Sequence, residues 1–291
     1  MIKNKVLVTG GAGFVGYHTV ELLIEKGYEV TVLDNLSTGK IKNLFHKKQE
    51  IKFIGGDLRI PEDVERAVKG QDYIIHLGAV LSVPESMSNP AVYQEVNVQG
   101  TFNVLDFAHK HGIKRVVLAS TCAVEGDSFY GLSKRITEEI AHWYGVIHGL
   151  ETVCLRYVNV YGERQRQEGA EGAVVPAFIN TLLKYESPTI HGDGSQTRDY
   201  VYVKDVAEAN VHALTCEFKG ISYVATSEET SVRTLLLTIS DIMKRDVHPI
   251  HVARREGDMM SVGSHKPSLE FGWVTKYTLK QGLENYINNF Q

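Results

Sequence analysis

The chain has 291 residues, of which 43% are hydrophobic and 23% are charged, and its formal net charge is −4. This composition supports a large buried core and argues against a disordered chain, and the charge balance gives no basic surface for nucleic acid. The apolar stretches are too short to span a bilayer, and Met1 leads into a strand-like segment without signal-peptide features. We therefore expect a cytoplasmic protein with no membrane or nucleic-acid partner.

The first half of the chain alternates between expected strands and helices. A short apolar strand at 5–8 precedes a helix at 14–26, which Gly27 ends, and a second strand follows at 28–33. Further strands are expected at 51–54, 73–77, 115–119 and 152–156, and further helices at 61–69, 91–110 and 130–147. Because strands that alternate with helices pair in parallel, the pattern predicts an α/β fold with a Rossmann-type, doubly wound parallel sheet.

After Asn159 the alternation loosens. We expect a loop at 162–172, a helix at 174–184, a turn at 191–195, a strand at 200–203 and a helix at 206–214, followed by short helices and loops. Because the sequence contains no low-complexity linker, the second part is expected to be intertwined with the first. The predicted division is a dinucleotide-binding domain of 1–160 plus about 197–226, and a smaller α/β portion of 161–196 and 227–291.

The three cysteines are Cys122, Cys154 and Cys216. Their number is odd and their spacings are wide, and no cysteine–histidine cluster has the spacing of a zinc site. We therefore expect reduced thiols and no metal ion, with Cys122 as a small packing residue.

A glycine-rich segment lies between the first strand and the first helix. It contains the pattern G-x-G-x-x-G at Gly11, Gly13 and Gly16. Glycines permit the tight turn and let the backbone approach a pyrophosphate, while the helix N-terminus presents amide groups to the anion. Asp34, at the end of the second strand, would accept both ribose hydroxyl protons, and no arginine follows it for a 2′-phosphate. The arrangement predicts NAD rather than NADP.

A tyrosine and a lysine are four residues apart at the start of the expected helix 130–147. Tyr130 and Lys134 therefore share one helix face. A phenol is a poor base at neutral pH, but a nearby ammonium and the positive nicotinamide ring would lower its pKa. Such a pair alone is most often a helix-surface pair; downstream of a dinucleotide fold, a catalytic role is favoured.

Ordered motifs extend over nearly the whole chain. They include TGGAGFVG at 9–16, DNLSTG at 34–39, HLGA at 76–79, SVPES at 82–86, NVQGT at 97–101, YGLSK at 130–134, RYVNVYG at 156–162, GDGSQTRDYVYVKDVAEA at 192–209 and RREGD at 254–258. With these motifs the chain resembles the extended short-chain dehydrogenase/reductases, in the NAD-dependent epimerase/dehydratase family. Within that family it is most similar to the UDP-hexose 4-epimerases.

The resemblance implies a role for each matching residue. It implies that Thr121 hydrogen-bonds the sugar O4 and the tyrosine, that Tyr130 is the base, and that Lys134 is its electrostatic partner. It implies NAD contacts by Tyr130, Lys134, Gly10, Gly13, Phe14, Val15, Gly16, Asp34, Asn35, Ser37, Thr38, Gly39, Asp57, Leu58, Leu77, Gly78, Ala79 and Asn97. It implies UDP-sugar contacts by Ser82, Thr121, Asn159, Val174, Arg198, Arg255 and Asp258. The guanidinium fork suits a diphosphate, although either arginine alone would more often be a solvated surface residue.

The activity that the resemblance implies is NAD-dependent 4-epimerisation of a UDP-hexose through a transient 4-keto sugar. Ser261 and Val262 occupy the position that limits bulk at C2, and both are small, so UDP-GlcNAc and UDP-GalNAc are expected as substrates beside UDP-Glc and UDP-Gal. Related 4,6-dehydratases carry Asp-Glu at the positions of Cys122 and Ala123, and related decarboxylases carry a glutamate at the position of Ala123. Dehydration and reduction are therefore expected less than epimerisation. A non-catalytic NAD-binding sensor or scaffold is the remaining alternative.

The sequence departs from the family between Thr121 and Tyr130. Only eight residues separate them, and Glu125 replaces the tyrosine of the usual Val-Tyr-Gly. Either the native connection is short, which would leave the sugar site more open, or the sequence lacks part of a longer loop. The intact mass of the protein distinguishes the two explanations.

The resemblance also implies a homodimer. Family members pair the helices that correspond to about 91–110 and 130–147 into a four-helix bundle. Phe102, Leu105, Trp143 and Ile147 would contribute to that interface, or they belong to the core of one subunit.

Overall fold

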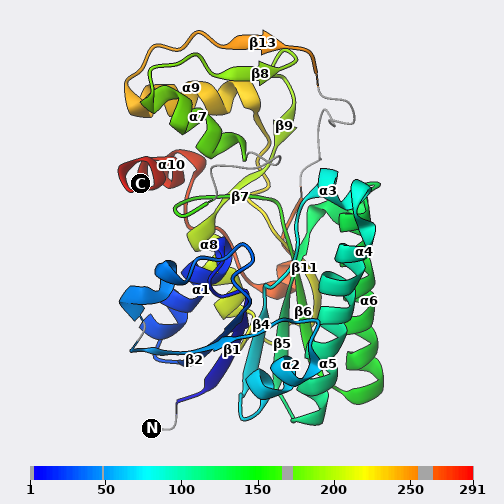
Figure 1. Cartoon of the computed structure of the whole chain (residues 1–291). Helices are drawn as coiled ribbons and strands as arrows, with labels where there is room; N and C mark the ends of the chain where they lie inside the picture. Colours follow the sequence, from blue (N-terminus) through cyan, green and yellow to red (C-terminus); the bar gives the residue numbers. More distant parts are fainter. Residues whose placement is uncertain (1–2, 48, 166–172, 255–264, 291) are drawn as a thin grey trace. The chain divides into compact units, whose positions relative to one another are not determined.

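The computed structural model describes residues 3–47, 49–165, 173–254 and 265–290 (Figure 1). Its contacts divide the chain into two compact units. The first unit comprises Met1–Tyr157, Val206–Tyr223 and Ser268–Trp273, and the second comprises Val158–Asp205, Val224–Pro267 and Val274–Gln291.

A parallel sheet forms the centre of the first unit. Within the described residues its strands are β1 (Lys5–Thr9), β2 (Glu29–Asp34), β3 (Ile51–Gly55), β4 (Tyr73–His76), β5 (Arg115–Thr121), β6 (Glu151–Tyr157) and β11 (Gly220–Val224). They lie in the order β11-β6-β5-β4-β1-β2-β3, and the pairings from β3 through β1 to β6 are parallel. The order reverses between β1 and β4, where a doubly wound sheet opens at its carboxyl edge. The predicted Rossmann-type fold is confirmed.

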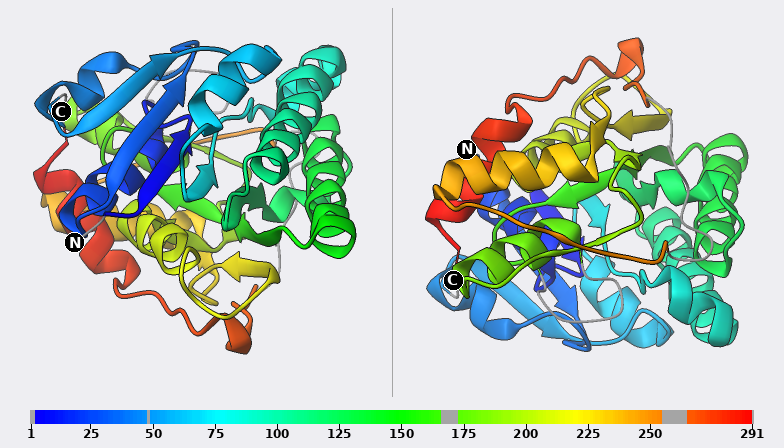
Figure 2. Two further views of the ribbon diagram at one scale, coloured as in Figure 1. Left: turned by 90° about the horizontal axis from the view of Figure 1, so that it is seen from below. Right: turned by 90° about the horizontal axis from the view of Figure 1, so that it is seen from above.

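Helices cover both faces of this sheet (Figures 1 and 2). One face carries α2 (Pro61–Val68), α5 (Gly100–Lys110) and α6 (Phe129–His148), and the other carries α1 (Phe14–Glu25) and α8 (Val203–His212). The side chains of Thr19 in α1 and Asn210 in α8 are joined by a hydrogen bond of 3.1 Å. Strands β1, β4 and β5 are almost continuously buried, as expected for a sheet covered on both sides.

The segment between β4 and β5 differs from its prediction. The single helix expected at 91–110 is divided into α4 (Pro90–Tyr93), a π-helical turn η2 (Gln94–Gln99) and α5, and α3 (Val83–Ser88) precedes them. Hydrophobic periodicity cannot detect one widened turn, because the residues on either side remain helical. A π-helical turn often lies at a functional position, and this one carries Asn97, a predicted cofactor residue.

The second unit combines helices with short strand pairs. Its helices are α7 (Val174–Leu183), α9 (Val232–Met243) and α10 (Leu279–Asn288), and α9 packs against both others. Its strands pair as β7 (Asn159–Tyr161) with β10 (Tyr200–Tyr202), β9 (Thr197–Arg198) with β12 (Thr230–Ser231), and β8 (Thr189–His191) with β13 (Ile250–Val252). The hydroxyl of Ser231 caps α9, and Thr278 and Gln281 form a capping box on α10.

Residues beyond 214 are more regular than predicted. We expected short helices and loops, whereas α9 has 12 residues and β11 joins the central sheet. Strand β11 was missed because it has only five residues, of which the first two are exposed, and its pairing partner β6 lies far away in sequence.

The compact units also differ in detail from the predicted domains. Residues 197–205 belong to the second unit, because β9 pairs with β12 and β10 pairs with β7 in that unit. Residues 268–273 belong to the first unit, where the ring of Phe271 contacts that of His212. The assignment of one ligand to each part stays a prediction. Among the described residues, no helix is long and apolar enough to cross a membrane.

Candidate active site

The glycine loop after β1 is built too tightly for side chains. Gly10 has a φ of 68°, and a Cβ there would lie 2.7 Å from the amide nitrogen of Gly78. A Cβ on Gly16 would lie 2.1 Å from the carbonyl oxygen of Gly10. Gly13 caps α1 with its backbone alone, and the first turn of α1 has no acidic residue. The positive end of the helix is therefore available to an anion such as a pyrophosphate.

Asp34 ends β2 beside this loop. Its carboxylate is buried, and it accepts hydrogen bonds from the backbone N–H groups of Ala12 (2.9 Å) and Leu36 (2.8 Å). A carboxylate has further lone pairs with which to accept ribose hydroxyls. Gly39 packs against this corner, since a Cβ there would lie 3.1 Å from an Asp34 oxygen. The loop and the carboxylate therefore fit a dinucleotide with an unmodified 2′-hydroxyl.

A polar cluster follows β3. The carboxylate of Asp57 accepts two hydrogen bonds from the guanidinium of Arg59, at 3.0 and 2.8 Å, and one from Asn35 at 2.9 Å. These contacts, first of all the hydrogen bonds from Arg59, hold the pKa of Asp57 well below its usual range. Leu58 is fixed by the side chain of Asn103, which donates to its carbonyl oxygen at 2.8 Å.

Fifteen of the eighteen predicted NAD contacts gather at one edge of the sheet. They stand at or directly after the carboxyl ends of neighbouring parallel strands: the glycine loop and the start of α1 (Gly10, Gly13, Phe14, Val15, Gly16) after β1, the segment 34–39 (Asp34, Asn35, Ser37, Thr38, Gly39) after β2, Asp57 and Leu58 after β3, and Leu77, Gly78 and Ala79 after β4. This is the edge at which doubly wound sheets bind ligands.

The predicted catalytic residues lie at the end of β5 and the start of α6. Thr121 is the last residue of β5, and its hydroxyl oxygen accepts the N–H of Ala123 at 3.2 Å. Tyr130 is buried in the first turn of α6, which Ser128 caps through the N–H of Gly131 at 3.0 Å. Lys134 follows one turn later, also buried, and its ammonium donates to the carbonyl oxygen of Ala119 at 3.0 Å. The phenol and the cation thus share the helix face that is turned away from water.

Burial changes the proton equilibria of this region. It lowers the pKa of Lys134 from its ordinary 10.5 to about 8. Burial, and then the Lys134 charge, lower the pKa of His76 to about 3, so this imidazole is neutral at physiological pH.

His76, the last residue of β4, forms hydrogen bonds with side chains of β1 and α5. Its Nδ1 lies 2.7 Å from the hydroxyl of Thr9, and its Nε2 lies 3.0 Å from the hydroxyl of Thr101. The Thr9 hydroxyl also accepts the N–H of Gly78 at 3.1 Å. The sequence motif HLGA includes His76, but no role was predicted for it. A histidine ending an apolar strand is a weak signal, because it is more often a hydrogen-bonded core residue than a ligand.

Asn97 links the loop after β4 to α6. Its amide oxygen accepts the N–H of Val80 at 2.9 Å, and its amide nitrogen donates to the carbonyl of Val80 and to the hydroxyl of Ser133, both at 3.0 Å. Ser133 in turn donates to the carbonyl of Tyr130 at 2.8 Å. The structure therefore gives Asn97 a bridging role that the motif NVQGT did not reveal, and its contact with NAD stays a prediction.

The predicted substrate residues come from both units. Ser82 caps α3 in the first unit, and its carbonyl accepts the hydroxyl of Tyr93 at 2.6 Å. In the second unit, Asn159 donates to the carbonyl of Asp199 at 3.0 Å, Arg198 donates to the carbonyl of Thr197 at 2.7 Å, and Val174 begins α7. Arg255, Asp258, Ser261 and Val262 lie outside the described residues.

All three cysteines are free thiols. Cys154 is buried, and burial raises its pKa to about 12. Cys122 is half-buried at the start of η3 (Cys122–Glu125). Among the described residues, no cluster of three His, Cys, Asp or Glu side chains could hold a metal ion.

Comparison with known proteins agrees with this geometry. The model of the NAD dependent epimerase/dehydratase family matches residues 6–225. The chain belongs to this family. NAD is the family's cofactor, and the resemblance that the sequence motifs indicated is confirmed.

Relatives include enzymes named for more than one reaction. A putative UDP-glucose 4-epimerase of Methanocaldococcus jannaschii is 39% identical and aligns over 97% of each chain. The structure of a UDP-N-acetylglucosamine 4-epimerase from Methanobrevibacter ruminantium M1, in complex with UDP-N-acetylmuramic acid, superposes with a TM-score of 0.95 at 32% identity, covering 100% of this chain and 99% of that one. A UDP-N-acetyl-alpha-D-glucosaminuronate decarboxylase of Bacillus cytotoxicus is 31% identical over 86% of this chain and 84% of its own.

Proposed function

We propose that this protein is an NAD-dependent 4-epimerase of UDP-hexoses. The observation that carries the proposal is the pair of Tyr130 and Lys134, buried one helical turn apart beside the strand end that carries Thr121. Relatives named as 4-epimerases, aligned over nearly the full length of the chain, support the same reaction.

The cofactor would be held by the residues at the carboxyl edge of the first-unit sheet. The glycine loop and the N-terminus of α1 would bind the pyrophosphate, and Asp34 the adenosine ribose. When bound, NAD supplies an acceptor that takes a hydride from the sugar and gives it back.

Tyr130 would act on the proton of the sugar. Its phenolate would remove the proton from the C4 hydroxyl as the sugar is oxidised to a 4-keto form, and it would return that proton after the ketone has been reduced on its other face. The ammonium of Lys134 favours the phenolate, because a positive charge lowers the cost of a nearby negative one. Thr121 uses a lone pair to accept the N–H of Ala123, so its proton can be donated to the sugar oxygen.

The nucleotide part of the substrate would bind to Asn159, Val174 and Arg198 of the second unit, and to Arg255 and Asp258. Arginine suits this task because its planar fork pairs with two phosphate oxygens. A firmly held diphosphate would let the 4-keto sugar turn without leaving the protein, which epimerisation requires.

Dehydration and decarboxylation are the competing reactions within the family. One relative is named as a decarboxylase, so the family alone does not select the reaction. In this chain Cys122 and Ala123 follow Thr121, and neither can act as the carboxylic acid or carboxylate of acid–base catalysis. The residues at this position therefore favour epimerisation. A non-catalytic NAD-binding sensor is disfavoured because Tyr130 and Lys134 are both in place.

For the sugar, the proposal includes both plain and N-acetylated hexoses. Ser261 and Val262 are small side chains at the position that limits the space at C2, and SVPES at 82–86 resembles the versions that handle N-acetylated sugars. UDP-GlcNAc and UDP-GalNAc would then be interconverted beside UDP-Glc and UDP-Gal.

A substrate panel tests the proposal. The purified protein, without added NAD, would be incubated with UDP-Gal, UDP-GalNAc, UDP-glucuronate and dTDP-glucose. The products would be separated by chromatography, compared with standards of the 4-epimers, and their masses measured. We expect products of unchanged mass, epimerised at C4, from UDP-Gal and UDP-GalNAc. A product that has lost water or carbon dioxide would show that the protein catalyses dehydration or decarboxylation instead of epimerisation. If no sugar gives a product, the non-catalytic NAD-binding sensor would be favoured. Exclusion of UDP-GalNAc alone would refute the argument from Ser261 and Val262.

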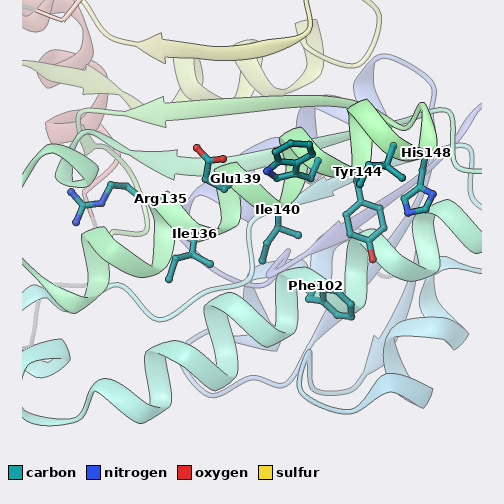
Figure 3. A pocket seen from close by; sticks show the side chains of 9 residues that line it. Phe102, Arg135, Ile136, Glu139, Ile140, Tyr144 and His148 are labelled. Carbon is teal, nitrogen blue, oxygen red and sulfur yellow. The ribbon is translucent and has the colours of Figure 1, made fainter.

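We also propose that the protein is a homodimer. Between α5 and α6 lies an open apolar groove of about 490 Å³, lined by Phe102, Arg135, Ile136, Glu139, Ile140, Trp143, Tyr144, Ile147 and His148 (Figure 3). The ring of Phe102 in α5 packs edge to face against the ring of Tyr144 in α6, with 6.1 Å between the ring centroids. Of the four residues predicted for the interface, Leu105 belongs to the core, whereas Phe102, Trp143 and Ile147 are exposed. An exposed apolar helix face of this kind favours a second copy of the same face.

A further inference from the structure

A partly buried ion pair lies next to the end of β5 that carries Thr121. Arg156 in β6 donates to both carboxylate oxygens of Glu138 in α6, at 2.8 and 2.7 Å. Glu138 also accepts the hydroxyl of Ser120, which directly precedes Thr121, at 2.5 Å. The side chains of Arg156 and Glu138 are only 21% and 5% exposed. Charge-assisted bidentate contacts away from water hold their partners in one geometry.

Tyr223 in β11 extends this pair to the surface. Its hydroxyl oxygen accepts a hydrogen bond from Arg156 at 3.1 Å, and its proton is donated to the carboxylate of Glu125. The Arg156 guanidinium also lies 5.5 Å from the centre of the Tyr223 ring. A phenol has one proton to donate. Because the Arg156 cation donates to the Tyr223 oxygen and the Glu125 carboxylate accepts its proton, the direction of the Tyr223 O–H bond is fixed.

These contacts close a ring around the end of β5, which we call the β5 ring. Its side chains are Ser120, Glu138, Arg156, Tyr223 and Glu125, and the backbone of 121–124 closes it. Thr121 lies on this backbone segment. The position of Thr121 is therefore set from two sides, by the strand that leads into it and by η3, whose last residue is Glu125.

The same segment also sets the start of α6. A Cβ on Gly131 would lie 2.2 Å from the carbonyl oxygen of Ala123, so the backbones of η3 and of the first turn of α6 are in close contact. Arg135 donates to the carbonyl of Val124 at 2.9 Å. A displacement of η3 would therefore shift the turn that carries Tyr130.

We propose that the hydrogen bond between Tyr223 and Glu125 is a positioning contact that sets Thr121 against Tyr130 for the chemical step. The proposal rests on the proposed epimerase function. It concerns a feature of this chain, because Glu125 stands where the family usually has tyrosine and only eight residues connect Thr121 to Tyr130. With so short a connection, the exposed link between Glu125 and Tyr223 takes over the restraint that a longer loop would provide.

Variants of the two residues test the proposal in the NAD-loaded enzyme. Tyr223→Phe removes the hydroxyl that bonds Arg156 and Glu125, and Glu125→Ala removes the carboxylate acceptor. We expect each to lower kcat by about 10- to 100-fold, as for a small misplacement of reacting groups, with unchanged KM for the UDP-sugar and unchanged NAD content. Glu125→Gln keeps an acceptor oxygen and should recover most of the rate lost in Glu125→Ala. The double variant should lose no more than Tyr223→Phe alone, because both substitutions break the same contact between Tyr223 and Glu125.

Tyr185→Phe is the matched control. The hydroxyl of Tyr185 also accepts a hydrogen bond from an arginine, Arg245, at 2.7 Å, but it lies in the second unit and outside the β5 ring. Any of three results would overturn the proposal. The first is a normal kcat in Tyr223→Phe and Glu125→Ala, and the second is rate losses that add in the double variant. The third is a rate loss that is matched by a loss of bound NAD. Wild-type protein that epimerises no UDP-hexose would instead refute the proposed function, and the positioning role with it.

Discussion

The ammonium of Lys134 donates to the carbonyl oxygen of Ala119 at 3.0 Å, which anchors a buried cation to the strand that ends in Thr121. The helix that carries Lys134 also carries Tyr130 one turn earlier. A cation in this place is unfavourable for stability, because burial disfavours its charge. The same charge favours the phenolate that the proposed reaction needs, so function and stability make opposite demands on this residue.

Lys134→Met should therefore give an inactive protein that is more stable at pH 7. The lowering of the Lys134 pKa from 10.5 to about 8 corresponds to about 3 kcal/mol of unfolding free energy. The lost hydrogen bond to Ala119 would offset about 1 kcal/mol of that gain. Urea unfolding of both proteins at pH 7 measures the difference.

The pH dependence supplies the control for this prediction. Because the pKa of Lys134 is lowered in the folded state, the folded protein releases this proton between about pH 8 and 10.5, while the unfolded chain still holds it. The stability of the wild type relative to Lys134→Met should rise over this interval. A difference that stays the same from pH 7 to pH 10 would show that the buried charge is not its cause.

Tyr130→Phe should keep the cofactor and lose the reaction. Removing a general base lowers rates by about 10²- to 10⁴-fold, while the contacts proposed to hold NAD lie mainly on other residues. The rate of C4 epimerisation and the NAD released on denaturation measure the two effects. Tyr185→Phe, on the second unit, serves as the control, and near-normal turnover by Tyr130→Phe would remove Tyr130 from the mechanism.

Gly16→Ala should abolish NAD binding. The added methyl group would lie 2.1 Å from the carbonyl oxygen of Gly10, so the loop would have to open where the pyrophosphate is expected. Gly55→Ala is the matched control, since its nearest contact would be an ordinary 3.9 Å. The NAD content of the two purified variants decides the matter, and full occupancy in Gly16→Ala would contradict the assigned pyrophosphate site.

Trp143→Glu combined with Ile147→Glu should give monomers. Both side chains are more than half exposed on α6 and line the apolar groove, and charges there would be buried in a dimer. Leu237→Glu changes a similarly exposed residue on α9 and should leave assembly unchanged. Sedimentation equilibrium reports the mass; a wild type that is already monomeric, or a double variant that remains dimeric, would rule out this interface.

The predictions of the NAD site and of the catalytic pair rest on local motifs. The glycine loop, Asp34 and the spacing of Tyr130 and Lys134 each depend on a few neighbouring residues, and apolar runs between glycine turns predict the strands of the sheet. The contacts that hold the site in place depend on distant partners. His76 bonds Thr9 across 67 residues of sequence, and Asn97 bonds Ser133 across 36. No periodicity or spacing rule connects residues so far apart.

The same limit explains the errors in the fold. The π-helical turn η2 leaves no trace in a helical hydrophobic period, and β11 depends on pairing with β6. The short strands of the second unit span two or three residues each, too few for an alternating pattern to be recognised. By contrast, α6 was predicted to within one residue at each end, because 20 residues of helical periodicity leave little ambiguity.

Epimerisation in D₂O is the most direct test of the central claim. If the C4 hydride is taken up and returned by tightly held NAD, while Tyr130 moves only the hydroxyl proton, the carbon-bound hydrogen never exchanges with solvent. The product of UDP-Gal or UDP-GalNAc, examined by NMR, should be the 4-epimer with protium at C4. Deuterium at C4, or no 4-epimer from either sugar, would contradict the proposed function.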